Sequence, residues 1–255
     1  FHARAVTPQL SLVVPVYNEA GNILPLAESS VEVLRTLGRP FEIILVNDGS
    51  TDATAAEIAE AHARWPEVRE LALPQNSGQA IALLYGLRAA AGEYLLMMDG
   101  DGQNDPRDYP QLLGLVESGQ VDLACGWRVD RHDSTLRRIM SKIANVVRGA
   151  FLKDGVHDSG CQLRVMRREV REAFFPMELM QSFIPALAVA AGFRVGETPV
   201  RHHARLHGDS KYGFRRLLWR PAAAMVGLKW KILRGKTPRR GDDDGKLQAP
   251  TSKLQ

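Results

Sequence analysis

Residues 96–106, LMMDGDGQNDP, place three carboxylates within seven positions, directly behind an apolar run. Asp99 and Asp101 flank Gly100, so one turn can present both side chains to the same ion, and the glycine lets a ligand approach the backbone. Acidic groups this close repel one another unless a cation lies between them. Such oxygen ligands suit Mg²⁺ or Mn²⁺, which typically bind one or two carboxylates together with phosphate oxygens. The alternative is a solvated acidic turn without a metal.

Apolar runs on both sides of this turn predict how it is held. Strands are expected over 10–16, 41–46, 68–73, 93–98, 121–126, 162–166 and 193–200. Helices are expected over 79–91, over 180–191 and where Leu24, Ala27, Val31 and Leu34 recur at helical spacing. Strands that alternate with helices indicate βαβ units. We therefore predict an α/β fold with an open, mostly parallel twisted sheet and helices on both faces.

Polar residues gather where several of these strands end. Four strand ends read PVYNEA, NDGSTD, DGDGQ and GWR. Ligands bind beyond the carboxyl ends of the strands in such sheets, so these groups are expected to share one rim. Asp48, in the second sequence, fits either an ordinary Asp-Gly turn or a carboxylate that accepts hydrogen bonds from a nucleobase.

The sequence is more basic after the fifth strand. Residues 135–152 predict an amphipathic helix with Arg137 and Arg138 one turn before Ser141. The loop RLHGDSKYG places Arg205 and Lys211 where they could close over a diphosphate, although a solvated basic loop is the alternative. Residues 214–234 mix leucines and tryptophans with cations, as in a helix that lies on a membrane surface or one packed on the domain with its basic face in water.

The composition argues against several other classes of protein. The 255 residues carry a formal net charge of +4 and two cysteines, Cys125 and Cys161, which fit small core residues better than a disulfide or a zinc site. No apolar run is long enough to cross a bilayer, so no transmembrane helix is expected. Dehydrogenase, P-loop and hydrolase signatures are missing from the sequence. No nucleic-acid partner is expected, because the basic residues form no patch interleaved with aromatic ones.

Taken together, the motifs resemble the family 2 glycosyltransferases, in particular the polyprenyl-phosphate hexose synthases related to dolichol-phosphate mannosyltransferase. The resemblance covers residues 9–220 and rests on VVPVYNEAGNI, LVNDGSTDAT, NSGQAIALLYGLRAAAGEYLLMMDGDGQNDP, GWR, LRRIMSKIAN, DSGCQLRVMRREV and HGDSKYG. It implies a GT-A fold, a UDP- or GDP-linked sugar donor, a Mg²⁺ or Mn²⁺ cofactor and inversion at the anomeric carbon.

The resemblance also implies roles for individual residues. The nucleotide-sugar site would comprise Pro15, Tyr17, Glu19, Asp48, Asp99, Gly100, Arg205 and Lys211. The metal would be held by Asp99, Asp101 and Gln103. The acceptor phosphate and its transfer would depend on Arg128, Arg137 and Ser141, beside Asp99 and Asp101. The sequence departs from the family at Gly102, where a bulky residue is common, and at Asp105, where Pro is common.

We therefore expect an N-terminal extension over 1–9, a catalytic domain over 10–213, an amphipathic helix over 214–236 and a disordered tail over 237–255. The expected enzyme moves a hexose to a polyprenyl phosphate and contacts the cytoplasmic face of the membrane peripherally. Two alternatives remain open. The acceptor could instead be a hydroxyl of a glycolipid or saccharide, which would require a carboxylate base. The protein could also bind nucleotide sugars or anionic lipids without catalysis.

Overall fold

The computed structural model describes residues 7–129, 147–203 and 216–241, with the backbone alone for 216–222. Its strands are β1 Leu10–Val16, β2 Phe41–Asn47, β3 Val68–Ala72, β4 Tyr94–Met97, β5 Leu123–Arg128, β6 Arg164–Arg167 and β7 Val195–Val200. Its helices are α1 Ile23–Thr36, α2 Thr54–Arg64, α3 Gln79–Ala89, α4 Tyr109–Glu117, α6 Met180–Ala190 and α7 Arg216–Leu233. Short 3₁₀ helices lie at η1 Pro106–Asp108 and η2 Arg168–Ala173.

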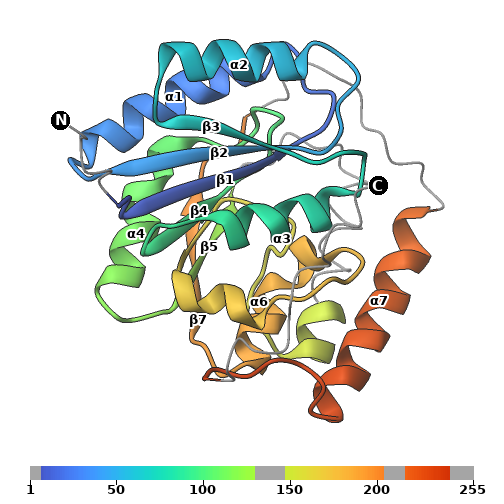
Figure 1. Cartoon of the computed structure of the whole chain (residues 1–255). Coiled ribbons are helices and arrows are strands. Elements are labelled where there is room, and N and C mark those ends of the chain that lie inside the picture. Colours follow the sequence, from blue (N-terminus) through green and yellow to red (C-terminus); the bar gives the residue numbers. More distant parts are fainter. Residues whose placement is uncertain (1–6, 130–146, 204–215, 242–255) are drawn as a thin grey trace.

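The strands form one seven-stranded sheet in the order β3-β2-β1-β4-β6-β5-β7 (Figure 1). Neighbouring strands are parallel except that β6 runs antiparallel to both β4 and β5. The predicted open, mostly parallel sheet is therefore confirmed. Because β4 and β5 are each antiparallel to β6, they run in the same direction, and both end at the edge where β6 begins.

Helices cover both faces of the sheet, as predicted (Figure 1). One core cluster packs α1, α2 and α4 against the side of β1 that carries Leu10, Leu12 and Val14. The other packs α3 and α6 against the opposite side, which carries Val13. The continuous apolar runs of the central strands follow from this arrangement, since a strand covered on both faces buries every side chain.

The helix α7 packs on the second core cluster through Leu228, which is 1% exposed, while Val226, Trp230 and Leu233 are exposed. Within the described ranges, none of the helices combines the length and the apolar character that crossing a bilayer requires. Of the amphipathic helix expected over 135–152, residues 147–152 are helical and 135–146 lie outside the described residues.

The expected domain boundaries stay predictions. Disorder was expected from residue 237, yet Thr237 is buried and the Arg240 backbone N–H donates to the Ala191 carbonyl oxygen at 3.0 Å. The Arg240 guanidinium also lies 5.1 Å from the centroid of the Phe193 ring. Contacts with the domain thus extend to Arg240, and 242–255 lie outside the described residues.

Candidate active site at the carboxyl edge of the sheet

The carboxyl ends of β1, β2, β4 and β5 and the start of β6 share one edge of the sheet. Val16 pairs with Asn47 at the ends of β1 and β2, and Met97 of β4 and Cys125 of β5 both pair with Arg164 at the start of β6. The structure therefore brings together the four strand ends that the sequence predicted to share a rim.

The loop after β1 is fastened to the loop after β2. The Asn18 backbone N–H donates to Ser50 Oγ at 3.0 Å, and Asn18 Oδ1 accepts from the Thr51 backbone N–H at 2.8 Å. The Glu19 backbone N–H donates to Thr54 Oγ1 at 2.8 Å. These bonds hold the segment with Pro15, Tyr17 and Glu19, three of the predicted nucleotide-site residues, against the neighbouring loop.

Asp48, expected at the nucleobase, holds the loop between β3 and α3. Its Oδ1 accepts from the Ser77 backbone N–H at 2.7 Å and its Oδ2 from the Gly78 backbone N–H at 2.8 Å, and the residue is 2% exposed. The neighbouring Gly49 lies close to the same loop, because a Cβ there would come within 2.6 Å of the Gln75 carbonyl carbon. Its φ of +68° also disfavours other residues.

The acidic pair follows β4, as predicted. Asp101 is 8% exposed, and Asp99 is partly exposed. The pKa of Asp99 is raised to about 7, chiefly by burial and next by the nearby Asp101, while Arg128 and Arg164 act in the opposite direction. Gly100 between them is required by packing, because a Cβ there would lie 2.7 Å from Val16 Cγ1.

Two carboxylates that disfavour each other's charge are suited to a divalent cation, whose charge would remove the repulsion. Within residues 7–129, 147–203 and 216–241, no group of three or more His, Cys, Asp or Glu side chains is placed to hold one ion. Asp99 and Asp101 could supply two carboxylates to such an ion while other oxygens complete the shell, as is common for Mg²⁺ bound with phosphates.

The turn after the acidic pair is tied to residues 201–203. Gln103 Nε2 donates to the His203 carbonyl oxygen at 3.3 Å, and the Gln103 carbonyl accepts from the His203 backbone N–H at 2.9 Å. Asn104 Oδ1 accepts from the Asp99 backbone N–H at 3.1 Å. The predicted metal ligand Gln103 therefore has its amide nitrogen turned to residue 203, and its role as a ligand stays a prediction.

Asp105 and Gly102, the two departures from the family pattern, have local structural roles. Asp105 Oδ1 accepts from the Arg107 backbone N–H at 3.0 Å at the start of η1, and its Oδ2 lies 3.0 Å from His203 Nε2. Burial alone would raise the pKa of Asp105, but hydrogen bonds with Arg107 and His203 hold it well below its usual range. Gly102 has φ of +74°, a conformation that a bulky side chain would strain.

Arg128, predicted to receive the acceptor phosphate, is paired with Asp158 at the end of β5. Arg128 Nε lies 2.7 Å from Asp158 Oδ2 and its Nη2 lies 2.9 Å from Asp158 Oδ1, with the two side chains 14% and 5% exposed. Beside them the Trp127 ring stacks on the His157 ring with centroids 5.5 Å apart. The structure thus places Arg128 at the rim with much of its charge balanced.

Three further polar residues at the rim were not identified from the sequence. Gln79 Nε2 donates to Asp99 Oδ1 at 2.7 Å, and Gln181 Nε2 donates to Gln79 Oε1 at 3.2 Å. Arg164 is fully buried, and its Nη1 donates to the Gln181 carbonyl oxygen at 2.7 Å. For Arg164 the sequence offered one signal, its position as the single charged residue in the apolar run QLRVM. A charge buried in a strand requires specific partners.

The remaining predicted site residues lie outside the described residues. Arg137 and Ser141 belong to 130–146, and Arg205 and Lys211 belong to 204–215. His203, which is hydrogen-bonded to Gln103, is the last described residue before 204–215.

Curated proteins of similar sequence act on lipid phosphates, by their names. The chain is 40% identical over 212 residues to the dodecaprenyl-phosphate galacturonate synthase of Rhizobium johnstonii, a match covering 82% of this chain and 63% of that protein. It is 36% identical over 211 residues to the undecaprenyl-phosphate 4-deoxy-4-formamido-L-arabinose transferase of Klebsiella pneumoniae, covering 82% and 64%. The chain thus spans less than two thirds of the length of these relatives.

A solved structure with a similar fold is the mannosyltransferase of Pyrobaculum calidifontis in complex with GDP-Man and Mn²⁺, with a TM-score of 0.62 and 23% identity. That match covers 92% of this chain and 67% of that one, and it confirms the expected GT-A type of sheet. The family model described as glycosyl transferase family 2 matches residues 11–175, which include β1 from its second residue, β2 to β6 and the Asp99–Asp101 turn. The chain therefore belongs to glycosyl transferase family 2.

Proposed function

We propose that this chain is a metal-dependent, inverting glycosyltransferase that moves a hexose from a nucleotide-diphosphate sugar to a polyprenyl phosphate. The observation that carries the proposal is the pair Asp99 and Asp101, crowded together at the carboxyl edge of a GT-A type sheet, where the pKa of Asp99 is raised to about 7. The names of the relatives support the acceptor, since both contain a polyprenyl phosphate.

Asp99 and Asp101 hold Mg²⁺ or Mn²⁺ in this proposal, with Gln103 as a third ligand. A bound divalent cation supplies positive charge next to the diphosphate leaving group, where negative charge develops. Arg205 and Lys211 contact the same diphosphate, the arginine as a two-pronged donor and the lysine as a single positive charge. The assignment is supported by His203, two positions before Arg205, which is hydrogen-bonded to Gln103.

The nucleotide lies over the ends of β1, β2 and β4 in the proposal, against Pro15, Tyr17, Glu19, Asp48 and Gly100. Each oxygen of Asp48 already accepts one backbone N–H, from Ser77 or Gly78. A carboxylate oxygen has a second lone pair, so Asp48 can still accept from a base. The main effect of Asp48 is then to fix the position of the loop between β3 and α3, which borders the base of a uridine or guanosine donor.

The acceptor phosphate is an anion near neutral pH, so it attacks the anomeric carbon without a general base. It needs cations that offset its repulsion from the donor diphosphate, and we assign that role to Arg128 and Arg137, with Ser141 as a hydrogen-bond donor. Arg137→Ala is expected to raise the KM for the lipid more than the KM for the donor. Equal changes in both KM values would contradict the assignment.

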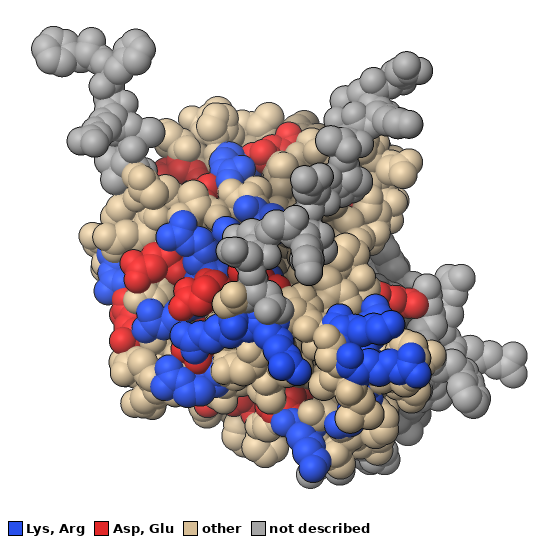
Figure 2. Space-filling model, turned by 60° about the horizontal axis from the view of Figure 1, so that its bottom comes forward, with Lys and Arg blue, Asp and Glu red and all other residues tan. Residues whose placement is uncertain are grey.

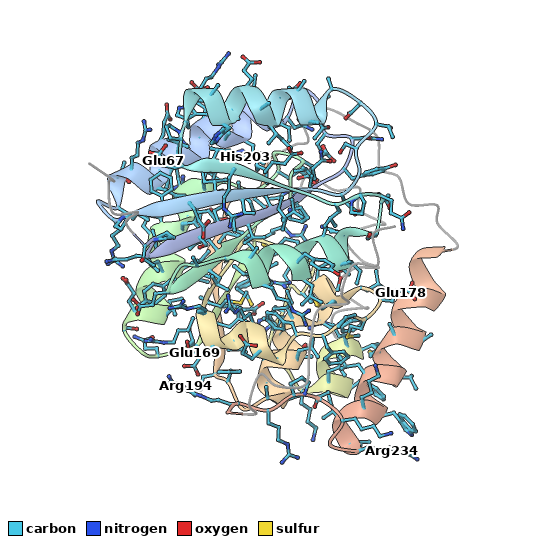
Figure 3. All side chains as sticks on the ribbon, viewed as in Figure 1. Glu67, Glu169, Glu178, Arg194, His203 and Arg234 are labelled. Atoms are coloured by element: carbon cyan, nitrogen blue, oxygen red, sulfur yellow. The ribbon has the colours of Figure 1, made fainter. Side chains whose placement is uncertain are left out.

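Contact with the cytoplasmic face of a membrane is proposed for the exposed side of α7. Val226, Trp230 and Leu233 are exposed there, and the Arg234 guanidinium lies 3.8 Å from the Trp230 ring centroid. Arg234 lies at the lower end of α7 (Figure 3), and Lys and Arg side chains gather on the face shown in Figure 2. Apolar side chains among cations suit an anionic bilayer surface. Co-sedimentation with anionic but not neutral vesicles, weakened by Trp230→Ala, tests this contact.

Isothermal titration with UDP- and GDP-sugars, each with Mn²⁺ and with EDTA, tests the donor site. Tight binding of one nucleotide that needs Mn²⁺ is expected. Asp101→Ala should abolish transfer without unfolding the chain. Asp101→Asn is the matched variant, because it keeps an oxygen for the Gln103 backbone N–H, which donates to Asp101 Oδ1 at 3.1 Å. Substantial transfer by Asp101→Ala with Mn²⁺ would refute the metal assignment, and absence of turnover with every donor would favour a binding protein.

A further inference from the structure

Two glutamine side chains connect Asp99 to the interior of the fold. Gln79 is the first residue of α3 and Gln181 lies in the first turn of α6. The Gln79 amide nitrogen donates to Asp99 Oδ1 at 2.7 Å, and its oxygen accepts from the Gln181 amide nitrogen at 3.2 Å. The three side chains form a chain of hydrogen bonds that starts at the rim and runs between two helices.

The inner end of this chain is fixed. Gln181 is 7% exposed, and its backbone carbonyl accepts from Arg164 Nη1 at 2.7 Å. Arg164 is fully buried, and its Nη2 donates to the Ser159 carbonyl oxygen at 2.8 Å. Leu179, just before α6, has φ of +59°, which is strained for a branched side chain. The surroundings therefore impose the position of Gln181.

The direction of the hydrogen bonds follows from the charge of Asp99. A carboxylate that binds a cation is ionised and only accepts, so Gln79 must turn its NH₂ group toward Asp99, as it does here, and its oxygen toward Gln181. Gln181 must then donate. If Gln79 turned its amide over, two oxygens would face each other at Asp99. Gln181 prevents this, because its NH₂ group satisfies the Gln79 oxygen only in the arrangement that suits the carboxylate.

Gln181 adopts this orientation at some cost. Its Oε1 and the Arg164 Nε are buried and make no hydrogen bond with the described residues. Unsatisfied buried polar atoms are unfavourable, and they persist where another requirement outweighs the penalty. Here the geometry suggests that the need to orient the Gln79 amide outweighs the penalty of leaving Gln181 Oε1 without a hydrogen bond.

We infer that Gln79 and Gln181 are positioning residues for Asp99, and that Gln181 acts only through Gln79. The inference rests on the proposed function, in which Asp99 binds a divalent cation. Gln79 holds Oδ1, while Oδ2 accepts no hydrogen bond from the described residues and is available to the cation. Fixing one oxygen selects one rotation of the carboxylate before the metal arrives, as outer hydrogen bonds do for metal ligands generally.

Mn²⁺ binding to the full chain, measured by titration calorimetry without donor, tests the inference. The variants are Gln79→Met, Gln181→Met and the double variant, since Met keeps the side-chain length and removes the amide. Gln79→Met is expected to weaken Mn²⁺ binding about tenfold. Gln181→Met should weaken it less, and the double variant should bind no more weakly than Gln79→Met. Gln111→Met is the matched control, because the exposed Gln111 donates one hydrogen bond, to the Pro199 carbonyl oxygen at 2.6 Å, on α4.

The outcomes separate this inference from the function on which it rests. If the unsubstituted chain does not bind Mn²⁺, the metal assignment and this inference both fail. If it binds Mn²⁺ and folded Gln79→Met binds equally well, only the positioning role is overturned. If the effects of the two substitutions multiply in the double variant, Gln181 does not act through Gln79. Should Gln181→Met fail to fold, Gln79→Met still decides, because Gln79 is partly exposed at a helix end.

Discussion

Asp48→Asn separates the observed role of Asp48, which holds a loop, from its proposed contact with a nucleobase. The carboxylate accepts the Ser77 N–H at 2.7 Å and the Gly78 N–H at 2.8 Å while 2% exposed. Asparagine keeps one acceptor oxygen for one of these backbone N–H groups. Its NH₂ group would face the other backbone N–H, so that hydrogen bond is lost. Loss of one charge-assisted bond at a buried site costs about 2 kcal/mol. We therefore expect unfolding at a temperature roughly 4–8 °C lower for a chain of this size.

The assay is thermal and urea unfolding followed by circular dichroism, with nucleotide binding measured on the same samples. Asp52→Asn is the control, because exposed Asp52 accepts from the Thr54 backbone N–H at 3.0 Å, where water can replace the bond. Its cost should stay below about 1 kcal/mol. If Asp48→Asn unfolds at the same temperature as the unsubstituted chain but loses nucleotide affinity, the loop-holding role is refuted.

Three further results are expected. Arg128→Met should cost roughly 3 kcal/mol in unfolding free energy, because it leaves the nearly buried Asp158 carboxylate without its main partner; a cost below about 1 kcal/mol would contradict this. Hydrogen bonds from Arg194 lower the pKa of Asp122, so the folded chain takes up this proton at lower pH than the unfolded chain. The resulting stability is complete above about pH 5 and is lost as the pH falls below about 4, and Asp122→Asn should flatten that loss in acid unfolding curves. Leu228→Ala should cost about 2–4 kcal/mol and expose α7 to proteolysis, and an unchanged digestion rate would refute its anchoring role.

The strands were predictable because burial on both faces makes them continuous apolar runs, and β1 and β2 fall within a residue of their expected bounds. The direction of β6 was not predictable, since its four residues show no pattern that distinguishes a parallel from an antiparallel neighbour.

The chemistry of the rim was partly predictable. Asp99 and Asp101 are close in sequence, so their meeting follows from one turn. The partners of Asp48 lie 29 and 30 residues away, and Gln181 lies 102 residues from Gln79. Such contacts depend on how helices pack, which periodicity does not determine. The family likeness points to residues that are expected to contact ligands, and it does not point to residues proposed to orient them.

The antiparallel β6 has a consequence for how the molecule comes apart. It is the one described strand that joins β3-β2-β1-β4 to β5 and β7, through four residue pairs on one side and three on the other. This short strand is a seam, and fraying it would divide the sheet into two halves. Asp99 would stay with one half and Arg128 with the other. Hydrogen exchange of the β6 backbone amides would then report whether the whole rim is intact. Loss of the β6 pairing would separate the side of the site that carries Asp99 from the side that carries Arg128.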